Sequence, residues 1–141
     1  MIDIESDVFT YVANAVRTSF SSVTVTNEYT ETFAKFPAVT IVEADNRVYR
    51  PARTANIENA VTVMYQVNVF SDKAAGKKAQ AKKIRAVVDA AFAELGFTRT
   101  MGNQVPNLRD DRIYRIVCRY EGIAVPEKSG NKTIYRIYQP R

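Results

Sequence analysis

The chain has 141 residues, a net charge of +5, and 46% hydrophobic and 25% charged residues, which is typical of one globular domain spanning residues 1–141. It contains no histidine, no tryptophan and one cysteine, Cys118. This composition removes the ligands on which zinc and iron–sulfur sites depend, and it excludes a serine–histidine–aspartate triad and an internal disulfide. We therefore expect no metal, no cofactor and no catalytic residues, so that an enzyme is the least favoured class of protein.

The beginning of the chain predicts a helix from Asp3 to about Phe20. Apolar residues recur there at steps of three and four, which is the spacing of one helical stripe. Asp3, Glu5 and Asp7 occupy the first turns, where the positive end of the helix dipole favours acidic side chains. The same acids argue against a secretory signal, which needs a positive region followed by a continuous apolar run.

The next part of the chain predicts strands. β-Branched residues favour an extended segment within Ser21–Thr26 and another over Ala38–Glu43. Asp45 and Asn46 tolerate the positive φ of tight turns, so they predict a two-residue hairpin that leads to a short strand at residues 48–49.

A long central strand is expected after a loop. Pro51 cannot donate to a β-ladder, so it should end the preceding strand before a loop over Arg53–Asn59. The odd-numbered residues of Val61–Phe70 are all apolar, which predicts a strand with one fully apolar face. Ser71 or Asp72 could cap the helix that follows.

The second helix is predicted by the helical spacing of its apolar residues. Gly96 lies where a left-handed C-cap is needed, and Phe97 can fold back against the last turn. The apolar set comprises Ala81, Ile84, Val87, Val88, Ala91, Phe92 and Leu95.

The last third of the chain predicts a loop and a hairpin. Thr98–Arg109 is rich in Gly, Asn, Gln and Pro, which predicts a long loop. Ile113–Glu121 alternates like a strand, and a turn over Pro126–Lys132 leads to a last strand over Thr133–Gln139. Together these elements predict an α+β fold with a single, mostly antiparallel β-sheet and two helices packed on one face.

The lone cysteine and the hydropathy pattern bear on the cellular setting. Cys118 lies in an apolar alternation, so we expect a small core residue in a reducing compartment. No stretch approaches 18 apolar residues free of charge, so no membrane span and no membrane partner are expected.

The charge is distributed unevenly along the chain. Residues 1–45 carry two basic and seven acidic side chains, a net charge of −5, whereas residues 46–141 carry 18 basic and eight acidic ones, a net charge of +10. If the fold keeps the two sets on different faces, copies of the chain could attract each other head to tail and close into a ring or extend as a filament. Alternatively, the two segments interleave in space and the asymmetry averages out.

Two groups of basic residues are candidate interface or anion-facing residues. The first half of the second helix is crowded with lysines, although cations there oppose the helix dipole, and the strand over Ile113–Glu121 has a basic second face. These residues fit either an anionic partner, such as a nucleic-acid backbone or an acidic subunit, or a simple solvated face. The candidates are Lys73, Lys77, Lys78, Lys82, Lys83, Arg115 and Arg119.

Signals of catalysis are weak. Asp110 and Asp111 are the nearest acid pair, but adjacent residues in a strand point to opposite faces, and the flanking arginines indicate a solvated turn. The five glycines are scattered, so no phosphate-cradling loop is present.

Particular stretches, in this order of elements, resemble the tail-terminator or tail-completion proteins of long-tailed bacteriophages, small proteins often labelled minor capsid or minor tail proteins. The order is a strand, then Ser-Asp, then a helix ending in Leu-Gly-Phe, then a loop and an Arg-Tyr-x-Gly strand. The stretches are IDIESDVFTYVANAV, TVMYQVNVFSD, KIRAVVDAAFAELGF, VPNLRDD and IYRIVCRYEGIAV.

The resemblance implies a virion structural protein without a cofactor. Its copies would form a hexameric ring at the head-proximal end of the tail tube, stop tube polymerisation, and provide the head–tail joining surface. The implied partners are the tail-tube protein, the head connector or neck protein, and DNA passing through the lumen. The implied location is the head–tail junction, after assembly in the host cytoplasm. The alternatives are another neck or head-completion protein, or a nucleic-acid-binding module that uses the basic helix.

Overall fold

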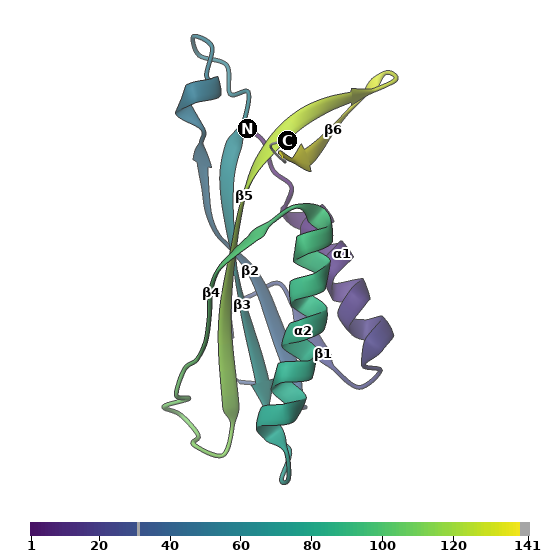
Figure 1. Cartoon of the computed structure of the whole chain (residues 1–141), viewed down its shortest axis with the longest axis vertical. Coiled ribbons are helices and arrows are strands. Elements are labelled where there is room, and N and C mark those ends of the chain that lie inside the picture. Colours follow the sequence, from purple (N-terminus) through teal and green to yellow (C-terminus); the bar gives the residue numbers. More distant parts are fainter. Residues whose placement is uncertain (31, 139–141) are drawn as a thin grey trace.

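The structure is a computed structural model that describes residues 1–30 and 32–138 of the chain. It has two layers, a six-stranded sheet and two helices that lie together on one face of the sheet (Figure 1). The strand order is β1-β2-β3-β5-β4, and β6 pairs with β5 beyond the end of β4. All pairings except β1 with β2 are antiparallel, so the predicted α+β fold is confirmed. No helix within the described ranges is long and apolar enough to cross a membrane.

The first helix, α1 (Glu5–Ser19), forms where the spacing of apolar residues predicts it. Glu5 and Asp7 lie in its first turn and Arg17 in its last, so each charge is at the end of the helix dipole that favours it. The residues buried against the rest of the protein are Val8, Val12, Ala13 and Val16.

The predicted hairpin at Asp45 and Asn46 is wrong. After the short β1 (Thr24–Thr26), β2 (Ala38–Val48) runs through both residues and stays paired with β3 along its whole length. A β-bulge next to Glu43 absorbs one residue, which lets the strand continue in register with its partner. The local preference for a turn is therefore outweighed by the pairing with a long neighbouring strand.

The two polar residues that suggested this turn have other partners. Asp45 forms an ion pair with Arg47. The side-chain amide of Asn46 donates a hydrogen bond of 3.0 Å to the carbonyl oxygen of Ile2. Asn46 thus joins the end of β2 to the beginning of the chain, whereas the Asp45 ion pair lies within β2.

The predicted central strand is confirmed. β3 (Val61–Ser71) lies between β2 and β5 and pairs with both over most of its length. Its odd-numbered residues from 61 to 69 are all buried in the core. The preceding residues, 49–60, form the predicted loop, which contains one 3-10 turn, η1 (Arg50–Ala52), around Pro51.

The second helix, α2 (Lys77–Leu95), has the predicted C-terminus but a different N-terminus. Gly96 adopts φ 98°, and the Phe97 N–H donates to the Phe92 carbonyl oxygen at 3.0 Å. The predicted cap at Ser71 or Asp72 is wrong, because β3 extends through Ser71 and the helix begins five residues after Asp72. The Ser71 hydroxyl instead donates to the Gln80 side chain at 2.6 Å.

The predicted long loop over Thr98–Arg109 is also wrong. Its first part forms β4 (Thr98–Gln104), an edge strand that pairs with β5. Most of its side chains are exposed, so its formation depends on backbone pairing to β5, and the sequence carries no apolar alternation that would reveal it. Residues 105–113 form the shorter connection that remains.

The last two strands form the predicted hairpin with a longer first strand. β5 (Tyr114–Ser129) continues eight residues beyond the predicted end, and β6 (Lys132–Ile137) pairs with its second part. The turn is shorter than predicted, because Pro126 already lies in the ladder opposite Tyr135, and Gly130 in the turn adopts φ 63°. The end of the predicted last strand, Gln139, lies outside the described residues.

An aromatic cluster fills the core between α2 and the sheet. The Phe92 ring stacks on Tyr120 with centroids 4.2 Å apart, and it meets Phe97 edge to face at 5.3 Å. Tyr65 contacts both phenylalanine rings at 5.8 and 5.5 Å. Cys118 is fully buried in the same core, as predicted.

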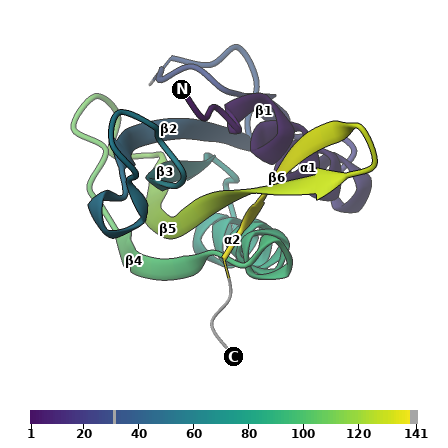
Figure 2. The same cartoon turned by 90° about the horizontal axis from the view of Figure 1, so that it is seen from above.

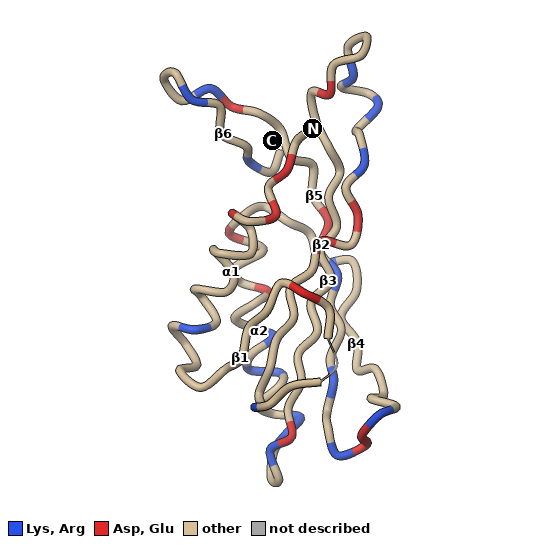
Figure 3. The backbone as a smooth tube through the Cα atoms, turned by 180° about the vertical axis from the view of Figure 1, so that it is seen from behind, with Lys and Arg blue, Asp and Glu red and all other residues tan. Residues whose placement is uncertain are grey.

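The sheet face opposite the helices is partly covered by loops. The Phe33 ring lies 5.1 Å from Phe70 and 5.8 Å from Phe36, so the segment before β2 packs on this face (Figure 3). Arg109 donates to the Thr32 hydroxyl at 3.3 Å, which joins this segment to the β4–β5 connection. Buried residues therefore lie on both faces of the lower half of the sheet.

Replacing Gly122 with alanine is expected to lower the free energy of unfolding by about 1–3 kcal/mol. A Cβ atom at this position would lie 2.8 Å from Ile137 Cγ2 and 3.1 Å from Phe97 Cδ1, inside van der Waals contact. Gly102→Ala is the matched control, because its Cβ would meet the flexible Arg99 side chain at 3.3 Å. Urea unfolding of both variants measures the difference; equal stabilities would contradict the expected steric conflict.

Candidate interaction surfaces

The lysines singled out in the sequence lie at the beginning of α2. Lys73 is exposed in the turn before the helix, and Lys77 donates to the carbonyl oxygen of Arg112 at 3.0 Å. Lys78, Lys82 and Lys83 are exposed. Within residues 1–30 and 32–138, these three lysines take part in no ion pair. They form an uncompensated cationic surface.

The two arginines singled out with them lie on the opposite face of the sheet. Arg115 donates from Nε and Nη2 to Asn68 Oδ1 at 3.0 and 2.8 Å, and its guanidinium lies 5.6 Å from the centre of the Phe70 ring. Arg119 is exposed, with Nε donating to Gln66 Oε1 at 3.1 Å. Helices cover the other face, so the structure does not bring these arginines and the lysines into one site.

The acid pair in the β4–β5 connection is engaged locally. Arg112 donates to Asp110 from its backbone N–H and its guanidinium, at 2.9 to 3.0 Å. These hydrogen bonds lower the pKa of the Asp110 carboxyl from its ordinary value. Asp111 is exposed. The pair is a solvated turn, as its sequence context indicates.

A cluster of carboxylates forms at the beginning of α1, which the sequence did not reveal. Asp3, Glu5 and Glu43 each offer an oxygen within 4.8 Å of the others. Such oxygens are the ligands that hard cations prefer, and this is the one group of three or more candidate ligands found among the described residues. The bulge in β2 and the start of α1 bring these acids together from positions about 40 residues apart.

Glu43 is the most perturbed member of this cluster. Burial raises the pKa of its carboxyl above the ordinary value, and the neighbouring acids Glu5, Asp3 and Asp45 raise it further. The Tyr65 hydroxyl donates to Glu43 Oε1 at 3.2 Å, which acts in the opposite direction. The cluster is therefore an acidic surface in which the negative charges repel one another.

Glu43→Gln is expected to raise the melting temperature by a few degrees near pH 7.5. The amide keeps an oxygen that accepts from the tyrosine, but it removes a carboxylate whose charged form is penalised in the folded state. Because the folded pKa of Glu43 is raised, the penalty is present above that pKa and is relieved as the pH falls toward the ordinary value of 4.5. The difference in melting temperature between Glu43→Gln and wild type should therefore decrease as the pH falls through this range. Asp111→Asn is the control, and equal shifts in both variants would contradict the prediction.

The end of the β5–β6 hairpin projects beyond the sheet and is called the arm (residues 125–136). β3 stops pairing with β5 at Ala124, so within the arm β5 pairs only with β6 (Figure 1). Seen from above, the arm passes over the side of the molecule that carries α1 (Figure 2). Within the arm, Ile134 and Tyr135 are 46% and 40% exposed, and Tyr138 next to it is 55% exposed.

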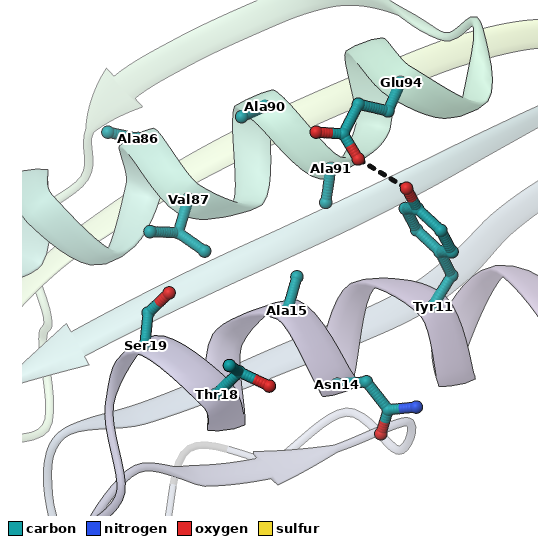
Figure 4. Close-up of a pocket in the computed structure, with 10 residues that line it drawn as sticks. All are labelled: Tyr11, Asn14, Ala15, Thr18, Ser19, Ala86, Val87, Ala90, Ala91 and Glu94. Atoms are coloured by element: carbon teal, nitrogen blue, oxygen red, sulfur yellow. Dashed lines mark hydrogen bonds between the residues drawn. The ribbon is translucent and has the colours of Figure 1, made fainter.

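A shallow groove of about 700 Å³ runs between the two helices. Figure 4 shows that α1 and α2 line it with mostly small side chains, and that Tyr11 donates to Glu94 across one end. The lining includes Ala15, Ala86 and Ala90. Its lining also includes the polar side chains of Asn14, Thr18 and Ser19.

Acidic residues gather in the middle of the molecule, where α1 begins (Figure 3). Basic residues lie on the arm and at the end where α2 begins, but acidic residues lie among them at both places (Figure 3). Acidic and basic residues are also mixed in the β2–β3 loop, so the two sets of charges are only partly separated in space. A comparison with models of known protein families and with curated proteins finds no match.

Proposed function

We propose that this protein is a tail terminator of a long-tailed bacteriophage. Its copies assemble into a ring, expected to be hexameric, that caps the head-proximal end of the tail tube. The ring ends tube polymerisation and presents the surface to which the head connector binds. This function needs surfaces for neighbouring proteins and no catalytic group.

The arm is the observation that carries this proposal. A two-stranded ribbon is at best marginally stable on its own in water. The arm nevertheless extends beyond the sheet, and it exposes Ile134 and Tyr135 on β6. An isolated protein gains little from such an element, whereas a ring subunit needs an element that reaches its neighbour.

Two further observations support the proposal. The carboxylates of Asp3, Glu5 and Glu43 form one acidic surface, and the lysines of α2 and the arm form basic ones, so that copies can attract each other through unlike surfaces. A repeated contact between two different surfaces closes into a ring when the rotation from each copy to the next adds up to a full turn. The sequence stretches quoted above also resemble those of tail terminators.

The test is tube capping. The purified chain is mixed with polymerising tail-tube protein of the same phage, and the tubes are followed by electron microscopy and light scattering. We expect ring-shaped particles at one end of each tube and a reduced tube length. A chain that leaves tube length and tube ends unchanged overturns the proposal.

The exposed lysines favour nucleic-acid binding as a second candidate function. Lys78, Lys82 and Lys83 carry no compensating acid among the described residues. If the protein binds nucleic acid in this way, replacing all three lysines with glutamate should abolish DNA binding. For wild type, the plot of log binding constant against log salt concentration should have a slope to which these three contacts contribute about −2.7. Fluorescence anisotropy with duplex DNA between 50 and 200 mM salt measures both effects, because a slope of about −2.7 lowers the affinity by about 40-fold over this range. Wild-type protein that shows no binding at the lower salt concentration eliminates this candidate.

A further inference from the structure

The half of the sheet that carries the arm is open on both sides. β1 pairs with β2 only up to Thr40, and β4 pairs with β5 only up to Glu121. Beyond these points β2 pairs with β3 as far as Val48, β3 pairs with β5 as far as Ala124, and β6 pairs with β5 from Ala124 onward. Among the described residues, no backbone hydrogen bond reaches the outer side of β2 at residues 43–48 or the outer side of β6. Open edges of this kind pair readily with another strand.

The ladder shows which backbone groups of β6 point outward. The Tyr138 N–H donates to the Ile123 carbonyl oxygen at 2.7 Å, which makes these two residues a hydrogen-bonded pair. Because such pairs alternate along an antiparallel ladder, the N–H groups of Thr133 and Tyr135 point away from β5. β6 therefore offers unused donors along its outer side.

The two open edges carry opposite charges. Lys128 and Lys132 lie at the end of the arm and take part in no ion pair within the described chain. The edge of β2 at residues 43–48 carries Glu43 and Asp45, with Asp3 beside them, and is called the acidic edge. Arg47 compensates only part of this negative charge.

The strand directions also fit a repeating contact. β2 and β5 run in the same direction, because each is antiparallel to β3, and β6 is antiparallel to β5. Copies placed side by side in the same orientation, and offset along the strands so that β6 lies level with residues 43–48, therefore bring β6 of one antiparallel to β2 of the next. Exposed apolar side chains lie on both partners, Ile134 on the arm and Val48 at the end of the acidic edge.

We propose that β6 of one copy pairs antiparallel with the acidic edge of the next copy, which continues the sheet from subunit to subunit. This inference rests on the proposed ring, and it names the surfaces that hold the ring together. The contact is heterologous, so one copy contributes its arm and the other its acidic edge.

The test is a charge exchange between two variants of the full chain. The arm variant is Lys128→Glu with Lys132→Glu, and the edge variant is Asp3→Lys with Asp45→Lys. Size exclusion with light scattering should show that wild type associates and that each variant alone is at least tenfold weaker. An equal mixture of the two variants should associate again, because each arm then faces an oppositely charged edge. Lys82→Glu with Lys83→Glu is the control with the same charge change elsewhere, and it should behave as wild type.

A backbone variant separates strand pairing from general electrostatic attraction. Thr133→Pro removes an outward donor but no hydrogen bond to β5, so it should weaken association with circular dichroism unchanged. Three results overturn the inference: single variants that associate like wild type, a mixture that stays dissociated, or wild type that is monomeric at the highest soluble concentration. Tube capping is measured in a separate experiment. If the arm variant still formed rings that cap tubes, the proposed function would stand and this contact between copies would be eliminated.

Discussion

Phe92→Ala is expected to lower the free energy of unfolding by about 3–5 kcal/mol, the range found for large aromatic side chains in cores. The Phe92 side chain is fully buried and stacks on Tyr120 with an interplanar angle of 5°. It also contacts Tyr65 and Phe97, so its removal leaves a cavity that three aromatic rings border. These rings belong to β3, β5 and the end of α2, and they cannot collapse into the space together.

Urea unfolding followed by circular dichroism measures this loss. Leu108→Ala is the matched control, because this leucine is almost fully exposed and its truncation creates no cavity. We expect the control to stay within about 0.5 kcal/mol of wild type. A Phe92 variant that is equally stable would show that the cluster is not part of the cooperative core.

Alkaline pH is expected to unfold the protein steeply, because two buried tyrosines resist ionisation. Burial and the neighbouring acids Glu43 and Asp89 raise the pKa of Tyr65 and Tyr120 well above the ordinary value of 10.0. Both hydroxyls donate to these carboxylates, at 3.2 and 3.0 Å. The folded state therefore keeps both phenols protonated at a pH at which the unfolded chain releases their protons.

The direction of the pH effect follows from proton binding. Below pH 10 both states hold the phenol protons, so the tyrosines do not change the stability with pH. Above pH 10 the unfolded state binds fewer protons, so each tyrosine lowers the free energy of unfolding by about 1.4 kcal/mol per pH unit. Urea unfolding between pH 8 and pH 11, one unit beyond the ordinary value of 10.0, measures the combined slope.

Tyrosine variants assign this slope. Tyr120→Phe should reduce the slope by about 1.4 kcal/mol per pH unit, and Tyr138→Phe is the control, because its side chain is 55% exposed. An unchanged slope in the Tyr120 variant would contradict the prediction. Persistence of the slope would instead require that another group releases protons on unfolding, such as Cys118, whose thiol pKa is also raised by burial.

The lysines of the candidate surface could be predicted from the sequence, but their relation to the arginines could not. Consecutive lysines on a predicted helix are exposed because the apolar stripe of the same helix must face the core. Arg115 and Arg119 lie on β5, whose alternate residues point to the face opposite the helices. A strand pattern shows that two faces exist, but only packing decides which face the helices cover.

The arm and the acidic cluster depend on tertiary structure. The pattern of β5 and β6 predicts a hairpin, but the arm extends beyond the sheet because β3 ends its pairing at Ala124, which is a property of another strand. Asp3 and Glu43 are distant in sequence, and they meet only when α1 begins beside the bulge in β2. Neither feature has a local signal.

The sequence by itself determined the two helices, the central strand and the left-handed cap at Gly96, because periodicity and glycine conformation act over a few residues. Only the tertiary structure decided that β2 continues through Asp45 and that β4 replaces a predicted loop. In both cases hydrogen bonds to a long neighbouring strand outweigh the local preference for a turn or a loop. Such pairing is non-local, so it is set by which strands the two helices and the core bring together.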